Sequence, residues 1–256
     1  MARRVSKRKR PSREKYILKE HQKVEEGVFN EKTVQNLGKL ITHNIISKLY
    51  FIIAKGKEAD VYLAEHGSLI KENIVVVKIF RVENSGFEKR LDYIIGDLRF
   101  TGIKKSMHNL VNTWCKKEYG NLKLAEEAKV NAPKPYAFFG NVLAMEFIGK
   151  DSIPAKTLKE EMLIEPNEVF DKILLNIKKL YKVGLIHGDI SEYNILINSG
   201  EPYIIDFGQA VVKSHPMAID FLKRDILNVC SYFSKKYNVK SDAEKIFYDI
   251  ISTDKQ

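Results

Sequence analysis

Three oxygen-bearing side chains in the second half of the sequence could act together on a phosphate group. Asp189 and Asn194 precede a short apolar run, 195–197, and Asp206 follows a second such run, 203–205. The turn residues between the two runs predict a β-hairpin, which brings residues before its first strand close to residues after its second. Two carboxylates and one amide oxygen at the mouth of a hairpin are hard ligands of the kind that Mg²⁺ takes, with phosphate oxygens and water completing its shell.

The spacing of these residues matches two motifs of one enzyme class. His-Gly-Asp at 187–189 followed by Asn194 resembles the H-x-D-x-x-x-x-N loop of protein-kinase-like phosphotransferases, and Asp-Phe-Gly at 206–208 resembles their D-F-G motif. Either motif alone is a weak signal. Both in this order across a predicted hairpin indicate a phosphotransferase.

Two charged residues upstream could serve the phosphates of a nucleotide. Lys78 lies within the strand-like run Val-Val-Val-Lys-Ile-Phe, where its ammonium could neutralise α and β phosphates. In a kinase-like fold such a lysine pairs with a helix glutamate, and Glu118 is the candidate. A merely solvated Glu118 stays open, because Lys116, Lys117 and Glu126 indicate that this helix is charged in any case.

The elements that must position these residues follow an α+β order. The Val-, Ile-, Tyr- and Phe-rich stretch 45–80 predicts three strands, and 110–128 predicts a helix. Pro166 opens an amphipathic helix that ends before Gly184. The other predicted elements are a short helix over 31–40, strands over 136–139 and 142–147, the hairpin, and two closing helices. Strands dominate before Gly149 and helices after it, so we predict a two-lobed layout.

Positive charge is concentrated at the start of the chain. Residues 1–15 contain eight Lys or Arg and one Glu, so they carry +7 of the net +10. Such a segment is expected to be disordered when free and to bind phosphate backbones. We predict a basic arm at 1–30, an N-terminal lobe at 31–149 and a C-terminal lobe at 150–256. RNA is the expected partner of the arm, with a solubilising tail as the alternative.

The composition argues against several other classes. The longest apolar runs, such as Leu49 to Ala54, are far shorter than the roughly 18 residues of a membrane span, and residues 1–15 contain no signal-peptide core. We therefore expect a cytoplasmic protein without a membrane partner. Cys115 and Cys230 lie outside any metal-ligand or redox spacing, which predicts buried free thiols.

The predicted phosphate loop departs from the ordinary kinase pattern. The segment G-K-E-A-x-V-Y at 56–62 has one glycine where protein kinases have G-x-G-x-x-G. It resembles the nucleotide loop of the RIO family of atypical kinases, and the resemblance covers roughly residues 31–237. Its other segments are 77–80, 97–100, 114–122, 145–149, 187–195 and 206–210. The RIO1-type branch is favoured, because the basic and irregular residues 1–44 leave too little room for the winged helix of the RIO2-type branch.

The resemblance implies a two-lobed, protein-kinase-like fold that uses ATP and Mg²⁺, with Mn²⁺ as an alternative metal. Asp189 would be the catalytic aspartate, Asn194 and Asp206 would bind the metal, and Lys78 would bind the phosphates. In the family the metal-binding aspartate can also accept the γ-phosphate, which makes Asp206 a candidate nucleophile.

Further positions are implied in the same way. Lys57 and Val61 of the nucleotide loop would contact the nucleotide, with Glu118 beside the phosphate-binding lysine. Backbone groups of Glu146 and Ile148 would bind adenine.

The resemblance also makes residues 81–109 a flexible loop, with Ser85 and Ser106 as candidate autophosphorylation sites. After Asp206 the sequence shows 50 residues and no Ala-Pro-Glu motif, so the peptide-docking segment of an ordinary kinase is not visible. Asp225 is interpreted as structural, on a charged face of a closing helix. We expect an ATP-driven serine/threonine kinase or ATPase switch that acts on a small ribosomal subunit precursor and its RNA.

Two alternatives remain at this stage. The H-G-D-x-x-x-x-N loop also resembles that of aminoglycoside and choline kinases, although few residues follow Asp206 to build their acceptor pocket. A nucleotide-gated RNA-binding assembly factor with negligible turnover is the other alternative. No DNA partner is expected.

Overall fold

The structure is a computed structural model that describes residues 29–68, 73–82, 93–94, 96–100 and 106–252. Most of the predicted basic arm, residues 1–28, lies outside the described residues, and so does Ser85.

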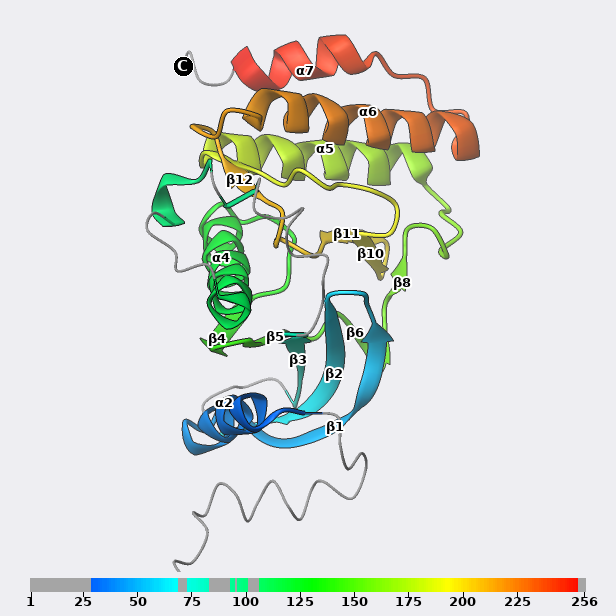
Figure 1. Ribbon diagram of the computed structural model, residues 1–256. Helices are drawn as coiled ribbons and strands as arrows, with labels where there is room; N and C mark the ends of the chain where they lie inside the picture. Colours follow the sequence, from blue (N-terminus) through cyan, green and yellow to red (C-terminus); the bar gives the residue numbers. More distant parts are fainter. Residues whose placement is uncertain (1–28, 69–72, 83–92, 95, 101–105, 253–256) are drawn as a thin grey trace, which may run out of the picture.

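A five-stranded antiparallel sheet dominates the first half of the molecule (Figure 1). In spatial order its strands are β1 (Ile46–Lys55), β2 (Ala59–His66), β3 (Ile74–Phe80), β5 (Val142–Glu146) and β4 (Pro135–Phe139). These runs suit strands because β-branched and aromatic side chains pack well on a pleated surface.

The alternation of side chains along β3 gives the sheet two different faces. Val75 and Val77 pack in one apolar cluster with Leu37 and Leu40 of helix α2 (Glu31–Thr42). Lys78 projects to the opposite face, where it lies between Val61 on β2 and Leu143 on β5 in the strand register. The sequence of β3 therefore places one cation among apolar neighbours.

Helix α4 (Met107–Glu127) connects the sheet to the rest of the molecule, and Figure 1 shows it between the sheet and the C-terminal helices. Its buried residues Trp114, Cys115 and Leu122 belong to the larger apolar cluster, which also contains Phe80 of the sheet and Phe207 near the hairpin. The helix is therefore packed on both sides.

The C-terminal part is mainly helical, and Figure 1 shows helices α5, α6 and α7 stacked in layers. Their bounds are Pro166–Lys182, Ala218–Tyr237 and Ala243–Ile251. The predicted hairpin consists of β10 (Ile195–Asn198) and β11 (Glu201–Ile204), with β8 (Lys156–Thr157) beside β10. The remaining short elements are β9 (Leu185–Ile186) paired with β12 (Val211–Val212), β6 (Gly149–Lys150) paired with β7 (Ile153–Pro154), and the 3₁₀ turn η3 (Leu98–Phe100).

The structure confirms the predicted α+β order and each predicted helix and strand, with small shifts at the ends. Gly184 takes a φ of +83° just past α5, a backbone region in which a side chain would be strained. Cys115 and Cys230 are free and buried, as predicted. One boundary is wrong: the loop expected over 81–109 includes the first turn of α4, which begins at Met107 after its N-cap Ser106.

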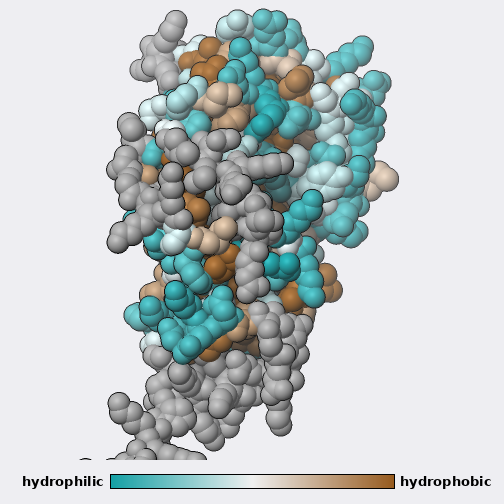
Figure 2. Space-filling model, in the orientation of Figure 1, coloured by the Kyte–Doolittle hydropathy of each residue, from teal (hydrophilic) through white to brown (hydrophobic). Residues whose placement is uncertain are grey.

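The surface shows no single large apolar area on the face drawn in Figure 2, where hydrophobic residues are scattered among hydrophilic ones. Among all the residues that the structure describes, the most exposed large hydrophobic side chains are those of Ile164, Met162 and Ile153. Within the described part of the chain, every helix is too short or too polar to cross a bilayer.

Candidate active site

The β10–β11 hairpin brings together two predicted loops, the catalytic loop of residues 187–194 and the metal loop of residues 206–208. Ile195 lies opposite Ile204 in its register, and the Ile205 N–H donates to the Asn194 carbonyl across the mouth at 3.0 Å. The Asn194 amide donates to the backbone oxygen of Asp189 at 2.9 Å and to its Oδ2 at 3.1 Å. Asp189 and Asn194 are therefore locked to each other.

Lys78 reaches the metal loop from the sheet. Its Nζ lies 2.8 and 2.9 Å from the two carboxylate oxygens of Glu118 and 3.0 Å from Oδ1 of Asp206. The structure thus brings four predicted residues, Lys78, Glu118, Asp206 and Asp189, into one region. The solvated alternative for Glu118 is wrong, because its side chain is 1% exposed.

The surroundings of Lys78, Glu118 and Asp206 shift the pKa values of these three side chains in different directions. Burial would lower the pKa of Lys78, but the carboxylates of Asp206 and Glu118 outweigh it and raise that pKa above its usual value. Burial raises the pKa of Glu118. Burial acts the same way on Asp206, yet the Lys78 ammonium holds its pKa below the usual range. The negative charge facing Lys78 is therefore held most firmly on Asp206, whose side chain is 47% exposed.

Asp189 has the surroundings of a proton acceptor. Burial raises its pKa, the nearby Asp206 carboxylate adds to that rise, and Arg224 partly offsets it. The amide of Gln209 donates to Asp189 Oδ2 at 3.2 Å and holds the carboxylate from a second side. A positioned carboxylate of raised pKa is suited to accept a proton from an attacking hydroxyl.

His187 is a structural bridge between the two loops. Its Nδ1 accepts the backbone N–H of Asp189 at 3.3 Å, so the ring proton is on Nε2, which lies 3.1 Å from the Ile205 carbonyl. Burial lowers the pKa of His187 to about 4, and the ring packs edge-on against Phe207. A neutral imidazole therefore ties the catalytic loop to the metal loop.

Asp225 corrects one sequence interpretation. The sequence placed it on a charged face of the helix, but it is 1% exposed, and its carboxylate accepts the backbone N–H groups of Gly188 at 2.7 Å and Ile190 at 2.9 Å. Its exposed neighbour Arg224 donates to the Gly188 carbonyl. Helix α6 thus holds the backbone on both sides of Asp189. The sequence predicted a structural role for Asp225 but not the contacts through which it acts.

The predicted nucleotide loop is a tight turn between β1 and β2. The Gly56 N–H donates to the Ala59 carbonyl at 2.9 Å, and a Cβ on Gly56 would lie only 2.9 Å from that oxygen. Arg81 braces the turn through a two-point contact with Asp60 at 2.9 and 2.5 Å. Lys57 is exposed on the turn, and Val61 lies opposite Lys78 in the strand register.

The segment expected to meet adenine begins at Glu146, the last residue of β5. The Glu146 N–H donates to the Lys134 carbonyl at 2.8 Å, and the Ile148 carbonyl accepts the Ala155 N–H at 3.0 Å. Ile148 is buried and Glu146 is half-buried. Their predicted contact with adenine remains a prediction.

The donor atoms of the metal loop fit a hard cation. Among the described residues, no cluster of three or more His, Cys, Asp or Glu side chains is placed to bind a metal, so the protein offers a mixed and incomplete set. Because the Asn194 amide nitrogen donates to Asp189, its Oδ1 is the atom that would face a cation. Asp206 adds a half-exposed carboxylate, and such a pair suits Mg²⁺ that keeps phosphate oxygens and water as further ligands.

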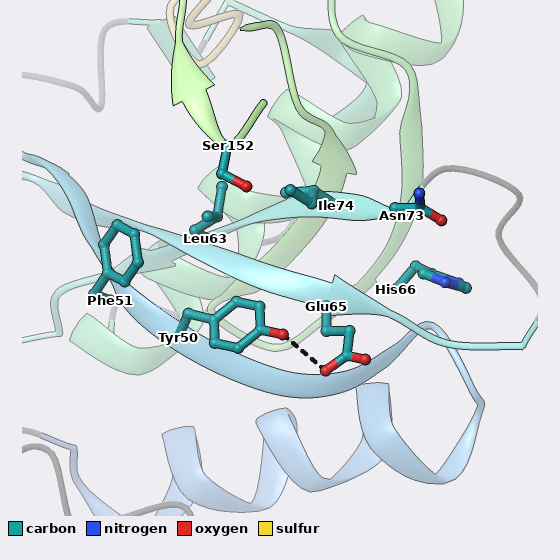
Figure 3. Close-up of a pocket in the computed structure, with 8 residues that line it drawn as sticks. All are labelled: Tyr50, Phe51, Leu63, Glu65, His66, Asn73, Ile74 and Ser152. Carbon is teal, nitrogen blue, oxygen red and sulfur yellow. Dashed lines mark hydrogen bonds between the residues drawn. The ribbon is translucent and has the colours of Figure 1, made fainter. Parts of the chain in front are cut away.

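A separate open pocket lies on the sheet (Figure 3). It has a volume of about 450 Å³ and is lined by Tyr50, Phe51, Leu63, Glu65, His66, Asn73, Ile74 and Ser152. The Tyr50 hydroxyl donates to Glu65 at 2.9 Å, so the one lining carboxylate already has a partner. None of these residues is among the predicted catalytic, metal-binding or nucleotide-binding ones.

Sequence reasoning also missed two buried polar residues of α4. Lys117, which the sequence analysis counted only among the charges of this helix, is 0% exposed, and Asn121 one turn later is 0% exposed as well. Both donate to backbone carbonyls of residues 207–210. Their spacing was the available signal, because they fall on the same stripe as the buried Trp114 and Leu122.

The fold and the site define a class. A protein-kinase-like phosphotransferase has a lysine on an antiparallel sheet, a helix glutamate paired with that lysine, and two loop aspartates joined by a hairpin. This protein has the same parts in the same arrangement.

Comparison with known proteins gives the family. Residues 60–246 match the family model described as the RIO domain. The chain is 37% identical to the RIO-type serine/threonine-protein kinase Rio1 of Haloferax volcanii, over 91% of this chain and 78% of that protein. It is 39% identical to Rio1 of Methanocaldococcus jannaschii, over 82% and 71%. The chain therefore belongs to the RIO family of atypical protein kinases.

A more distant relative supports the same assignment, and a solved structure supports the fold. The human serine/threonine-protein kinase RIO1 is 35% identical over 82% of this chain, which covers 37% of the human protein. A crystal structure of the Rio2 kinase–ADP/Mg²⁺–phosphoaspartate complex from Chaetomium thermophilum has the same fold, with a TM-score of 0.65 at 22% identity. That match covers 85% of this chain and 66% of the Rio2 chain, just under two thirds of its length.

Proposed function

We propose that this protein is an ATP- and Mg²⁺-dependent serine/threonine phosphotransferase of RIO1 type, with an N-terminal lobe of residues 31–149 and a C-terminal lobe of residues 150–256. One observation carries the proposal. Lys78 Nζ lies within 3.0 Å of both Glu118 and Asp206, on the sheet face that Val61 shares. A nucleotide on this face would meet Lys78 with its phosphates while its base lies near Glu146 and Ile148.

Each residue has a role that its surroundings support. Lys78 neutralises the phosphates, and Asn194 Oδ1 with the Asp206 carboxylate would hold Mg²⁺, or Mn²⁺ in its place, which supplies further positive charge. Asp189 orients the acceptor and takes its proton, and Gln209 and Asn194 fix the direction of that carboxylate. Positioning and electrostatics carry most of such a phosphoryl transfer.

An ATPase switch is part of the proposal. Asp206 is half-exposed and keeps its negative charge, so one of its oxygens could attack the γ-phosphorus while the bond to the bridging oxygen of ADP breaks. Water would then hydrolyse the aspartyl-phosphate. The name of the similar Rio2 complex includes a phosphoaspartate, which supports this route for the present chain. Helix α6 begins at Ala218, soon after Asp206, and leaves little chain to hold a peptide.

The function is tested by incubating the pure protein with γ-labelled ATP and Mg²⁺, with and without small ribosomal subunits. We expect free phosphate and a protein label that hydroxylamine removes and that Asp206→Ala lacks. A stable label on serine would instead favour a protein kinase. Absence of both nucleotide binding and phosphate release, in protein whose fold is intact, would contradict the proposal.

The polybasic residues 1–15 are proposed to contact RNA of a small ribosomal subunit precursor in the cytoplasm. Their +7 charge would release counterions from phosphates, so deleting them is expected to weaken RNA binding and to flatten its salt dependence, by up to about 5–6 in logarithmic slope. Binding of a labelled ribosomal RNA fragment at several salt concentrations measures this slope. An unchanged slope in the shortened protein would refute the contact, and unchanged ATP turnover is the control.

A further inference from the structure

Lys117 is a fully buried lysine that has no part in the proposed reaction. It neighbours Glu118 on α4, and its Nζ donates to the carbonyl oxygens of Gly208, at 2.9 Å, and Ala210. Burial lowers the pKa of Lys117 to about 7. Burying an ammonium group costs free energy unless its N–H groups form hydrogen bonds. The burial of Lys117 therefore indicates that its contacts have a specific role.

Asn121 contacts the same loop one helical turn later. Its amide donates to the carbonyls of Phe207 at 2.9 Å and Ala210 at 3.0 Å. The Asn121 Oδ1 accepts from Arg99 at 2.9 Å, which fixes which way the amide points. Arg99 is itself held by a two-point contact with the buried Asp97. Four donor contacts from α4 therefore end on the carbonyls of residues 207–210.

The contacted loop follows directly after Asp206, whose backbone is unusual. Asp206 has a φ of +64°, a left-handed conformation that costs a non-glycine residue energy and that neighbouring contacts must stabilise. Packing adds to these contacts, since a Cβ on Gly208 would lie 2.7 Å from the Trp114 ring nitrogen. The loop is thus pressed against α4 and tied to it.

We propose that Lys117 and Asn121 are positioning residues that hold the backbone of residues 207–210 and thereby aim the Asp206 carboxylate at Lys78 and the metal. Glu118, the neighbour of Lys117 on α4, holds Lys78 in place. The same part of the helix therefore positions both residues of the 3.0 Å contact between Lys78 and Asp206. This inference rests on the proposed function, because the proposed function makes Asp206 a metal ligand.

The test compares nucleotide affinity with and without Mg²⁺, measured with a fluorescent ADP analogue. Lys117→Met keeps the length of the side chain and removes its donors, and Asn121→Leu does the same at the second position. The matched control is Lys116→Met, which alters an exposed lysine of the same helix. We expect both buried variants to lose about 10-fold to 100-fold of the Mg²⁺-dependent gain in affinity, the usual effect of removing groups that orient a metal ligand.

Under the proposal, nucleotide affinity without Mg²⁺ is expected to stay at the wild-type value in both variants. A merely structural role would instead lower the affinity with and without Mg²⁺ alike, and thermal melts identify any variant that fails to fold. Lys117→Arg keeps donors at the site and is expected to recover part of the Mg²⁺ effect. If both folded variants keep the full Mg²⁺ effect, the inference is wrong. If the wild-type protein shows no Mg²⁺ effect at all, the proposed function fails instead.

Discussion

Replacing Asp189 by alanine is expected to lower ATP turnover by about 10²-fold to 10⁴-fold, the usual contribution of a positioned general base. Nucleotide binding should change little, because Asp189 contacts Asn194 and Gln209, whereas the nucleotide is proposed to rest on Lys78. Steady-state phosphate release and binding of a fluorescent ADP analogue measure the two quantities separately.

The control for this prediction is Asp171→Ala, which removes an exposed carboxylate from α5 without touching the catalytic loop. Its turnover should equal that of the wild-type protein. Wild-type turnover in Asp189→Ala would show that another group accepts the proton. A joint loss of turnover and nucleotide binding, with a normal melting curve, would place Asp189 in binding instead.

The sequence predicted that Asp189, Asn194 and Asp206 lie close together, because the segments that carry them are local. Asp189 and Asn194 are separated by four residues, and a short hairpin brings Asp206 to them, so turn chemistry alone sets their proximity. Lys78 and Glu118 were also predicted as partners, although only through the kinase-like pattern. These two residues lie far apart in the sequence, so no local turn or hairpin predicts that they come together.

The residues that sequence reasoning misplaced depend on tertiary packing. Asp225 looks like one of several charges at the start of α6, and only the docking of that helix beneath the catalytic loop buries it against the N–H groups of Gly188 and Ile190. Lys117 and Asn121 look like surface residues by type. Their position on the buried stripe of α4 outweighs residue type, because a helix packed on two sides exposes little of its surface.

Replacing Lys78 by methionine is expected to remove activity and to destabilise the protein. The phosphates would lose their protein cation, a loss of about 10²-fold to 10³-fold in turnover for one preorganised electrostatic group. Glu118 would be left in the interior without its partner, which typically costs about 3–5 kcal/mol of the free energy of unfolding. Urea unfolding and steady-state ATP turnover measure both effects.

The double variant Lys78→Met/Glu118→Gln separates these two causes. Removing both charges of a buried pair is often nearly neutral, so most of the lost stability should return, whereas turnover should stay low because the cation is still missing. As a control, Lys172→Met breaks the exposed contacts with Glu168 and Glu201 and should change stability little. Recovery of turnover in the double variant would show that Lys78 serves the fold rather than the phosphates. Wild-type stability in the single variant would show that Glu118 is not left as an uncompensated buried charge.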